Sequence, residues 1–417
     1  MDLLTLTSLL LVAAAGFGAV NYLFLKAPPA IGILIVSLAA SLVLLGLDAL
    51  FPAWEIKAPI RAVVLDIEFS DALLEGMLGL LLFAGALHVK VDDLRREWVL
   101  VLLMASLGVG LSTVIAGVGF SWITGMPLMI ALVFGALISP TDPVAVLGVL
   151  RAANLPKSLE TKIAGESLFN DGVAYVVFLV LVGLAFPADG HASGLSGAAV
   201  LFVQEAFGGA LLGAVLGWLA FRVMRRIDDP PLEVLITLAL AFGGYQLSLW
   251  LHVSAPIMAV IAGLLIGDVG TRDGMSVETK RHVDTFWTLI DEILNAVLFL
   301  LIGIEVFAIA FDGAYLLAGV AAIGLHLVAR FAAVAVPVAL LRPFSDTLEE
   351  GVTRIMTWGG LKGGISVALV LSLPETEWKP LMLTACYVVV LFSIIVQGLT
   401  VARVARRVGP GAAAAAD

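Results

Sequence analysis

The chain has little cysteine and little charge. Cys386 is its only cysteine, so no disulfide can form within the chain and no Cys/His zinc spacing exists. Charged residues make up 13% of the sequence, whereas soluble domains carry roughly 25%. The 23 basic residues are outnumbered by 33 acidic ones, which excludes the basic surface that binds nucleic acid.

Apolar residues take the place of the missing charges. They make up 61% of the chain, and the mean hydropathy is +1.09. This composition predicts an all-α polytopic membrane protein in which the 42 glycines allow close helix packing. The first apolar segment follows Met1 and Asp2 with no basic stretch before it, so we expect a retained span rather than a signal peptide.

Charged, Pro-rich or Gly-rich breaks divide the chain into apolar segments of about 20 residues, the length that crosses a bilayer as a helix. The segment at 255–267 is shorter than the others. Thirteen spans are predicted, at 4–25, 30–50, 70–89, 98–120, 127–150, 160–186, 199–221, 232–251, 255–267, 285–311, 313–341, 351–373 and 380–402.

Basic residues are distributed unevenly over the loops between these spans. With the N-terminus outside, 18 of the 23 bases fall in inner loops. Only Lys57, Arg61 and Lys379 fall outside, and Arg330 and Lys362 lie within spans. Because cytoplasmic loops are enriched in Lys and Arg, this pattern supports the span count. It predicts a plasma (inner) membrane protein with its N-terminus outside and its C-terminus in the cytoplasm.

Two spans are interrupted at corresponding positions. Thirteen spans divide as six, one and six, and an offset of seven places the two six-helix halves in inverted orientations. The fifth span contains ISPTDP at 138–143, and the twelfth contains WGGLKGG at 358–364. Discontinuous helices at matching positions mark the substrate site of a transporter, because unwound backbone is tolerated only beside a cavity. We therefore expect two inverted repeats with crossed discontinuous helices at about 127–150 and 351–373.

The sixth span begins with GESLFNDG at 165–172, where acids should be rare. On a helix, Glu166, Ser167, Asn170 and Asp171 share one face. An acid at bilayer depth is a functional-site hypothesis by default. In a semi-dry cavity, Asp171 could titrate near physiological pH and hold either a proton or a hard cation. The alternative is a protonated Asp171 that only donates a hydrogen bond between helices.

Thr141 and Asp142 stand between two prolines, which should open the helix and free carbonyl oxygens at mid-membrane. Oxygens of Asp171, Asp142, Ser167 and the Thr141 carbonyl would suit a weakly selective Na⁺ site. The alternative is that Thr141 or Asp142 merely caps the second half-helix.

Glu166 requires a basic partner, because an unpaired buried charge is far costlier than a paired one. We expect a structural pair with Arg330 in the eleventh span, in preference to direct cation binding by Glu166. Lys362 should lie near Asp142 and balance charge there, although a simple interior ion pair would also explain it. Because residue 170 is an asparagine, Asp171 is the one ionisable carboxylate at this pair of positions. This favours the exchange of one proton per cycle.

Weaker polar groups lie in the tenth and eleventh spans. Asp291, Glu292 and Asn295 either line a vestibule or form a solvated helix end. Among the five histidines, His326, one turn before Arg330, is the candidate for proton linkage.

Three motifs together resemble one family. They are GESLFNDG at 165–172, SPTDPVA at 139–145 and GGLKGGIS at 359–366. In this order and separation they resemble the NhaP-type sodium/proton antiporters of the monovalent cation:proton antiporter superfamily, over essentially all thirteen spans. Lys362 departs from the pattern, because these families usually carry arginine there, and lysine lacks the planar fork.

The resemblance implies electroneutral exchange of one cation for one proton by elevator-like alternating access, in a homodimer. It implies that residues 1–407 form one unit, with a core domain at about 70–186 and 285–402 in part and a dimerisation domain from the other helices. By motif position, Asp171 would bind the cation or proton, and Asp142 and Thr141 would complete the site. Ser167 and Glu166 would lie near the ion, Arg330 would pair with Glu166, and Asn170 would mark the electroneutral class.

Sodium is the expected cation, with lithium as a further substrate, and no cofactor or enzymatic activity is expected. K⁺/H⁺ exchange is the nearest alternative. A sodium-coupled organic-anion symporter would need polar donors for a large solute. An intramembrane hydrolase would need an aspartyl-protease motif, which the sequence does not show. We expect residues 408–417 to form a short unfolded tail.

Overall fold

The computed structural model describes residues 3–54, 58, 60–61, 72–143, 146, 157–186, 195–309, 311–343 and 351–408. Within these residues every regular element is a helix. The second half of the predicted span at 127–150 lies outside the described residues, apart from Val146, and so does the predicted tail after Val408.

The longer helices divide between the two halves of the chain. The first half of the chain forms α1 (Leu3–Val20), α2 (Pro29–Leu50), α5 (Leu78–Leu87), α6 (Val91–Leu103), α7 (Val109–Thr124), α8 (Leu128–Leu137) and α10 (Lys157–Ala185). The second half forms α11 (Leu195–Met224), α12 (Pro230–Trp250), α13 (Ala255–Leu265), α14 (Val277–Ile304), α15 (Gly313–Leu341), α16 (Val352–Trp358), α17 (Gly364–Leu371), α18 (Lys379–Leu391) and α19 (Gly398–Val408).

Wider and tighter helical turns extend or join several of these helices. Wider π-type turns occur at η1 (Asn21–Leu25), η3 (Ala72–Met77), η4 (Met104–Gly108), η5 (Ile266–Gly274) and η7 (Phe392–Gln397). Tighter 3₁₀ turns occur at η2 (Pro52–Trp54) and η6 (Glu305–Phe307). The turns η4 and η7 lie inside two longer helical stretches, Val91–Thr124 and Lys379–Arg407.

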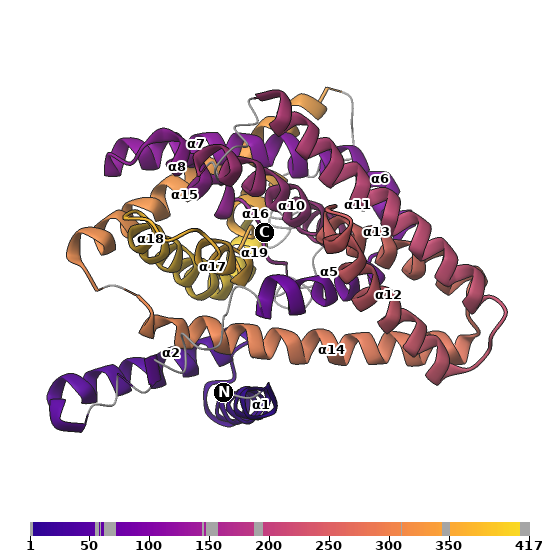
Figure 1. Ribbon diagram of the computed structural model, residues 1–417, viewed down its shortest axis with the longest axis horizontal. Coiled ribbons are helices and arrows are strands. Elements are labelled where there is room, and N and C mark those ends of the chain that lie inside the picture. Colours follow the sequence, from indigo (N-terminus) through magenta and orange to yellow (C-terminus); the bar gives the residue numbers. More distant parts are fainter. Residues whose placement is uncertain are drawn as a thin grey trace, which may run out of the picture.

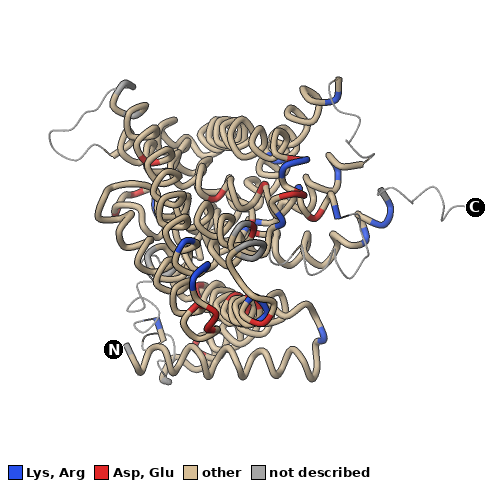
Figure 2. The backbone as a smooth tube through the Cα atoms, turned by 90° about the vertical axis from the view of Figure 1, so that its right-hand side faces the viewer, with Lys and Arg blue, Asp and Glu red and all other residues tan. Residues whose placement is uncertain are grey.

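The helices have the length and composition of membrane spans. Among the described residues, eight helical stretches are long and apolar enough to cross a bilayer, and three shorter apolar helices accompany them. Figure 2 shows that most of the chain is uncharged, with charges near helix ends and a few inside the bundle. Each of the thirteen predicted ranges contains a helical segment. The thirteen-span topology and the inverted repeat stay predictions.

At two places the helices extend further than the predicted spans and loops imply. The tenth span was expected to start at 285, but α14 starts at Val277, because Ser276 caps it by accepting a hydrogen bond from the Thr279 amide. Lys162 was placed in an inner loop, but it lies buried within α10. Its ammonium pairs with Glu97 of α6 at 3.4 Å, which explains how a lysine is tolerated there.

Two hydrophobic clusters form the interior. The first combines side chains of α2, α7, α8, α15, α17 and α18, and the second combines α5, α12 and α13. Helix α14 joins them, since Trp287 belongs to the second cluster and Phe299 to the first. In Figure 1, α14 runs along one long side of the molecule, with α11 and α12 at one end and α15 and α18 at the other.

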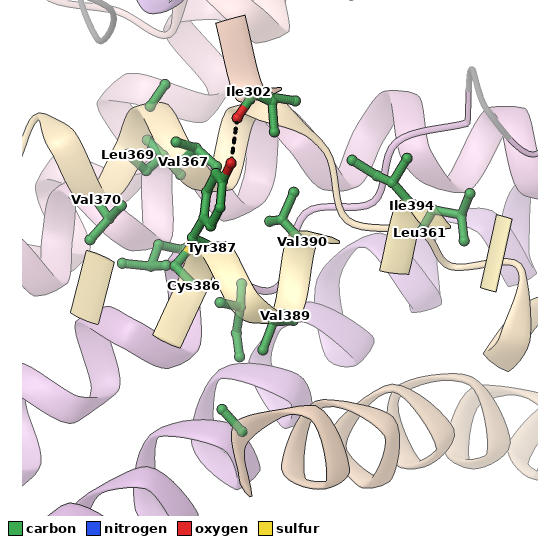
Figure 3. Close-up of a cluster of buried hydrophobic side chains, with 14 of the residues drawn as sticks. Ile302, Leu361, Val367, Leu369, Val370, Cys386, Tyr387, Val389, Val390 and Ile394 are labelled. Atoms are coloured by element: carbon green, nitrogen blue, oxygen red, sulfur yellow. Dashed lines mark hydrogen bonds between the residues drawn. The ribbon is translucent and has the colours of Figure 1, made fainter. Parts of the chain in front are cut away.

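Close contacts fix the first cluster. Phe120 of α7 stacks on Phe134 of α8 with ring centroids 3.8 Å apart, and small residues at this helix pair let the backbones approach. Figure 3 shows Tyr387 of α18 among aliphatic side chains, with its hydroxyl donating to the Ile302 carbonyl at the end of α14 at 2.9 Å. This bond satisfies a phenol that is otherwise buried in apolar surroundings.

Candidate functional site

The two predicted helix breaks meet in the middle of the molecule. Helix α8 ends at Leu137, and the chain from Ser139 to Pro143 is not helical. Helix α16 ends at Trp358 and α17 begins at Gly364. The backbone amide of Asp142 donates to the Leu361 carbonyl at 2.8 Å, so the unwound segments are joined directly. Backbone groups that have no helical partner at one break thus form hydrogen bonds with backbone groups at the other break.

Gly363 allows this contact. A Cβ at position 363 would collide with the side chain of Asp142. The glycine is therefore required for close approach of the two segments.

Lys362 stabilises the end of α8. Its side chain is fully buried, and its ammonium donates to the carbonyls of Ser139 at 2.8 Å and Pro140 at 3.0 Å. The amide of Lys362 donates to Ser393 Oγ at 2.9 Å. A cation at a helix C-terminus compensates the negative end of the helix dipole. Lys362 thus lies beside Asp142, as the sequence suggested, but its ammonium contacts carbonyl oxygens.

Glu166 and Arg330 form a bidentate ion pair. Arg330 Nη1 donates to Glu166 Oε1, and Nη2 donates to Oε2 at 2.7 Å. Nε and Nη2 of Arg330 also donate to the Met356 carbonyl, at 3.3 and 3.0 Å. Both charged side chains are buried. The pair links α10, α15 and α16, and it satisfies both carboxylate oxygens of Glu166.

Asn170 and Ser167 are bonded to the first break. Asn170 Oδ1 accepts from the Thr141 amide at 3.2 Å, and its Nδ2 donates to Thr141 Oγ1 at 2.7 Å. The hydroxyls of Thr141 and Ser167 are 3.0 Å apart. These contacts hold the unwound segment against α10.

Asp171 lies one residue further along α10 and is 6% exposed. Its Oδ1 has no hydrogen-bond partner among the described residues. Asp171 lines a cavity of about 540 Å³, together with Thr141, Asp142, Leu168, Gly363 and Asn295. A buried carboxylate oxygen without a partner is costly unless it binds a proton or a cation.

We call the part of the cavity lined by the end of α5, the starts of α6 and α10 and the middle of α14 its mouth. Lys90, Asp93, Lys157, Glu160 and Glu292 line this part. Acids outnumber lysines here, so the path to Asp171 favours cations over anions.

The eight predicted site residues are brought together, but they divide into two groups. Asp171, Asp142 and Thr141 line the cavity. Glu166, Ser167, Asn170, Arg330 and Lys362 are buried behind them and bond to protein groups. The predicted Na⁺ ligand set was Asp171, Asp142, Ser167 and Thr141. Of these, Ser167 is bonded to Thr141 and is not part of the cavity lining.

Sequence reasoning left the α14 residues undecided, and the structure assigns them to a vestibule. Asp291, Glu292 and Asn295 line the cavity together with Thr288. Their spacing of three and four residues was the available signal. His326 is buried in α15, away from the cavity lining, and its Nε2 has no partner in the described part of the chain.

Known proteins are similar to this chain in sequence and in fold. The family model for the transmembrane sodium/hydrogen exchanger matches residues 8–407. The Na⁺/H⁺ antiporter NhaP of Pseudomonas aeruginosa is 47% identical over 403 residues, which cover 94% of each chain. The Na⁺/H⁺ antiporter NhaH of Halobacillus dabanensis is 35% identical over 92% of this chain and 93% of its own.

A solved structure has the same architecture. The sodium proton antiporter MjNhaP1 from Methanocaldococcus jannaschii superimposes with a TM-score of 0.73 and 17% identity, over 97% of this chain and 99% of the other. At that identity the match concerns the fold. The sequence matches go further, and the chain belongs to the transmembrane sodium/hydrogen exchanger family, within it to the NhaP type.

Proposed function

We propose that the protein is an electroneutral antiporter that exchanges one Na⁺, or one Li⁺, for one H⁺, with Asp171 as the group that binds either ion. The observation that carries this proposal is that Asp171, whose Oδ1 is buried without a partner among the described residues, lines a cavity beside the unwound Thr141–Asp142 segment. A proton on Asp171 removes the charge that a hard cation requires. The two ions therefore compete for one carboxylate.

Asn170 supports the stoichiometry. The position beside Asp171 holds an amide, and both ends of that amide bond to Thr141. Asn170 therefore contributes no second titrating acid. Exchange of one proton for one monovalent cation moves no net charge.

The cavity suggests which side is open. Lys90 and Lys157 lie at its mouth, and the loop charges assign both to the cytoplasm. The structure then corresponds to an inward-open state of a thirteen-span protein with its N-terminus outside. Asp142 and Thr141 would complete the cation site from the cavity side, whereas Ser167 would act by orienting Thr141.

Alternating access requires the site to face the other side in turn. The two hydrophobic clusters provide two bodies for an elevator-like movement. In this proposal the body that contains α8, α15, α17 and α18 carries the broken helices and Asp171 past α5, α11, α12 and α13. The core domain is then narrower than the range of about 70–186 expected from the resemblance, because α5 stays with the second body. Assembly as a homodimer would hold the second body still.

The decisive experiment measures proton flux in proteoliposomes against Na⁺, Li⁺ and K⁺ in turn, with the membrane potential clamped. Asp171→Asn should abolish cation-dependent flux. Asp92→Asn, an exposed acid in the first turn of α6, is the matched control and should retain it. Substantial flux through the Asp171 variant would refute the assignment, and preference for K⁺ would establish K⁺/H⁺ exchange instead.

A further inference from the structure

One face of α14 leads from the mouth of the cavity to the central site. Thr288, Asp291, Asn295 and Leu298 are spaced by three or four residues and all line the cavity. A Cβ at Gly364 would collide with Leu298, and the preceding Gly363 packs on Asp142. Leu298 therefore marks the depth of the helix breaks, and Asn295 lies about one turn closer to the mouth.

Asn295 lines this path, and its side chain contains a buried oxygen without a partner in the described part of the chain. Its side chain is 4% exposed, and Nδ2 donates to the Asp291 carbonyl at 2.8 Å and to Asp291 Oδ1 at 3.1 Å. Both partners are acceptors, so the amide nitrogen must point to them. Its Oδ1 then has no partner among the described residues. A buried amide oxygen pays a desolvation cost that a bound donor or cation would offset.

The surroundings add negative charge and a fixed wall. Asp291 supplies a half-buried carboxylate one turn before Asn295, with its Oδ1 3.1 Å from Asn295 Nδ2. Opposite, His88 connects the end of α5 to α14, with Nδ1 2.7 Å from the Ala84 carbonyl and Nε2 3.1 Å from Thr288 Oγ1. A carboxylate and an amide oxygen are hard ligands that suit alkali cations.

We propose that Asp291 and Asn295 form a second monovalent-cation site, in which a partly hydrated cation waits before it reaches Asp171. This site rests on the proposed function, since it serves the same cavity. It binds more weakly than the central site because it offers one carboxylate and more open water. Its role is to raise cation occupancy at the entrance, so it affects the KM for the cation more than kcat.

Binding to purified protein tests the site without transport. We expect Asp171→Asn to retain weak equilibrium binding of radioactive ²²Na⁺ that is lost when Asn295→Leu is added. Asn295→Asp in the same background keeps an oxygen at this position and should preserve binding, which separates ligand loss from misfolding. Absence of any binding to the Asp171 variant, or binding that survives Asn295→Leu, would overturn the proposal.

Transport kinetics provide the second measurement. Asn295→Leu and Asp291→Asn should raise the KM for Na⁺ about fivefold, the effect of losing one ligand, with kcat within about twofold. Glu278→Gln removes the same charge from an exposed acid in the first turn of α14, outside the cavity lining, and should leave KM unchanged. Equal effects of the two acid variants would show charge steering and no site. If the wild-type protein itself shows no exchange, the proposed function fails, while the binding result still decides the second site.

Discussion

At the scale of single residues, Lys362 shows how a departure from a family motif can be accommodated. Its compact ammonium fits between the Ser139 and Pro140 carbonyls at 2.8 and 3.0 Å. These are single acceptors at a helix end, for which three rotatable donors are adequate and a planar fork is unnecessary. The bidentate task is performed by Arg330, which binds both oxygens of Glu166.

We predict that Glu166→Gln destabilises the protein more than it alters cation binding. Removing one partner of a buried pair leaves an uncompensated charge and costs about 3–5 kcal/mol. Thermal unfolding in detergent should therefore occur at a clearly lower temperature, with ²²Na⁺ affinity nearly unchanged in the folded fraction. Glu292→Gln, at an exposed site, is the control. A stable Glu166 variant with altered affinity would instead place Glu166 among the ion ligands.

At the scale of elements, the important unit is the junction of the two breaks. The Asp142 amide bonds to the Leu361 carbonyl, and Lys362 bonds to the last carbonyls after α8. Each unwound segment therefore provides hydrogen-bond partners for polar groups of the other. Because these bonds tie the segments together, we expect α8 and α17 to shift as one piece.

Gly363→Ala should lower the exchange rate at least tenfold while the protein still folds. The added methyl group would collide with the Asp142 side chain, and a displacement of about 1 Å in a site can cost up to a hundredfold. Proteoliposome flux would be compared with that of Gly313→Ala, where a Cβ meets nothing within 4 Å. Wild-type rates in the Gly363 variant would show that Asp142 need not be positioned so closely.

At the scale of the whole molecule, the cavity lies where the two hydrophobic clusters approach each other. Ile163 and Phe178 of α10 belong to the first cluster, whereas Leu168 reaches the second. Gly85 of α5 and Leu168 both line the cavity and lie close together, since a Cβ added at Gly85 would be 3.9 Å from Leu168 Cδ1. Relative movement of the clusters would separate these two positions.

Joining α5 to α10 should therefore stop exchange. Cys386 is the only cysteine and is buried, so cysteines introduced by Gly85→Cys and Leu168→Cys would be the reactive thiols. A short thiol cross-linker should abolish flux, and cleavage of the link should restore it. A monofunctional reagent of similar size on either single variant controls for plugging of the cavity.

The matched control joins two helices of the same body. Gly217→Cys and Leu265→Cys would place a Cβ at 217 3.4 Å from Cβ of residue 265, close to the separation in a disulfide. This pair links α11 to α13 and should leave exchange intact. Full activity of the α5–α10 cross-linked protein would exclude the elevator-like movement.

Much of the site could be predicted because charge is expensive in lipid. Glu166, Asp171, Arg330 and Lys362 stand out in apolar stretches, and the prolines of 138–143 predict an open turn. The contacts between individual side chains of the site were harder to predict. Ser167 was expected to bind the ion, and its hydroxyl lies 3.0 Å from that of Thr141. The sequence does not reveal this contact between α10 and the unwound segment, and direct ion binding by Ser167 stays a prediction.

The vestibule and the helix boundaries could not be predicted from the sequence, for a different reason. Asp291 and Asn295 have the same spacing whether a helix end is solvated or lines a cavity, so only packing decides between the two. Lys162 looked like a loop base because hydropathy cannot detect its partner Glu97 in another helix. Sequence therefore locates costly residues, and tertiary contacts determine the role of each.

The amide at position 170 also has a consequence for the cell. In the proposed exchange of one proton for each cation, the membrane voltage does no work on the cycle, and the antiporter responds to concentrations alone. A given ratio of proton concentrations across the membrane then sustains at most the same ratio of sodium concentrations. Net sodium movement reverses when the inside-to-outside ratio of sodium concentrations falls below that of proton concentrations. In this proposal Asn170, bonded at both ends to Thr141, limits the conditions under which the protein can export sodium.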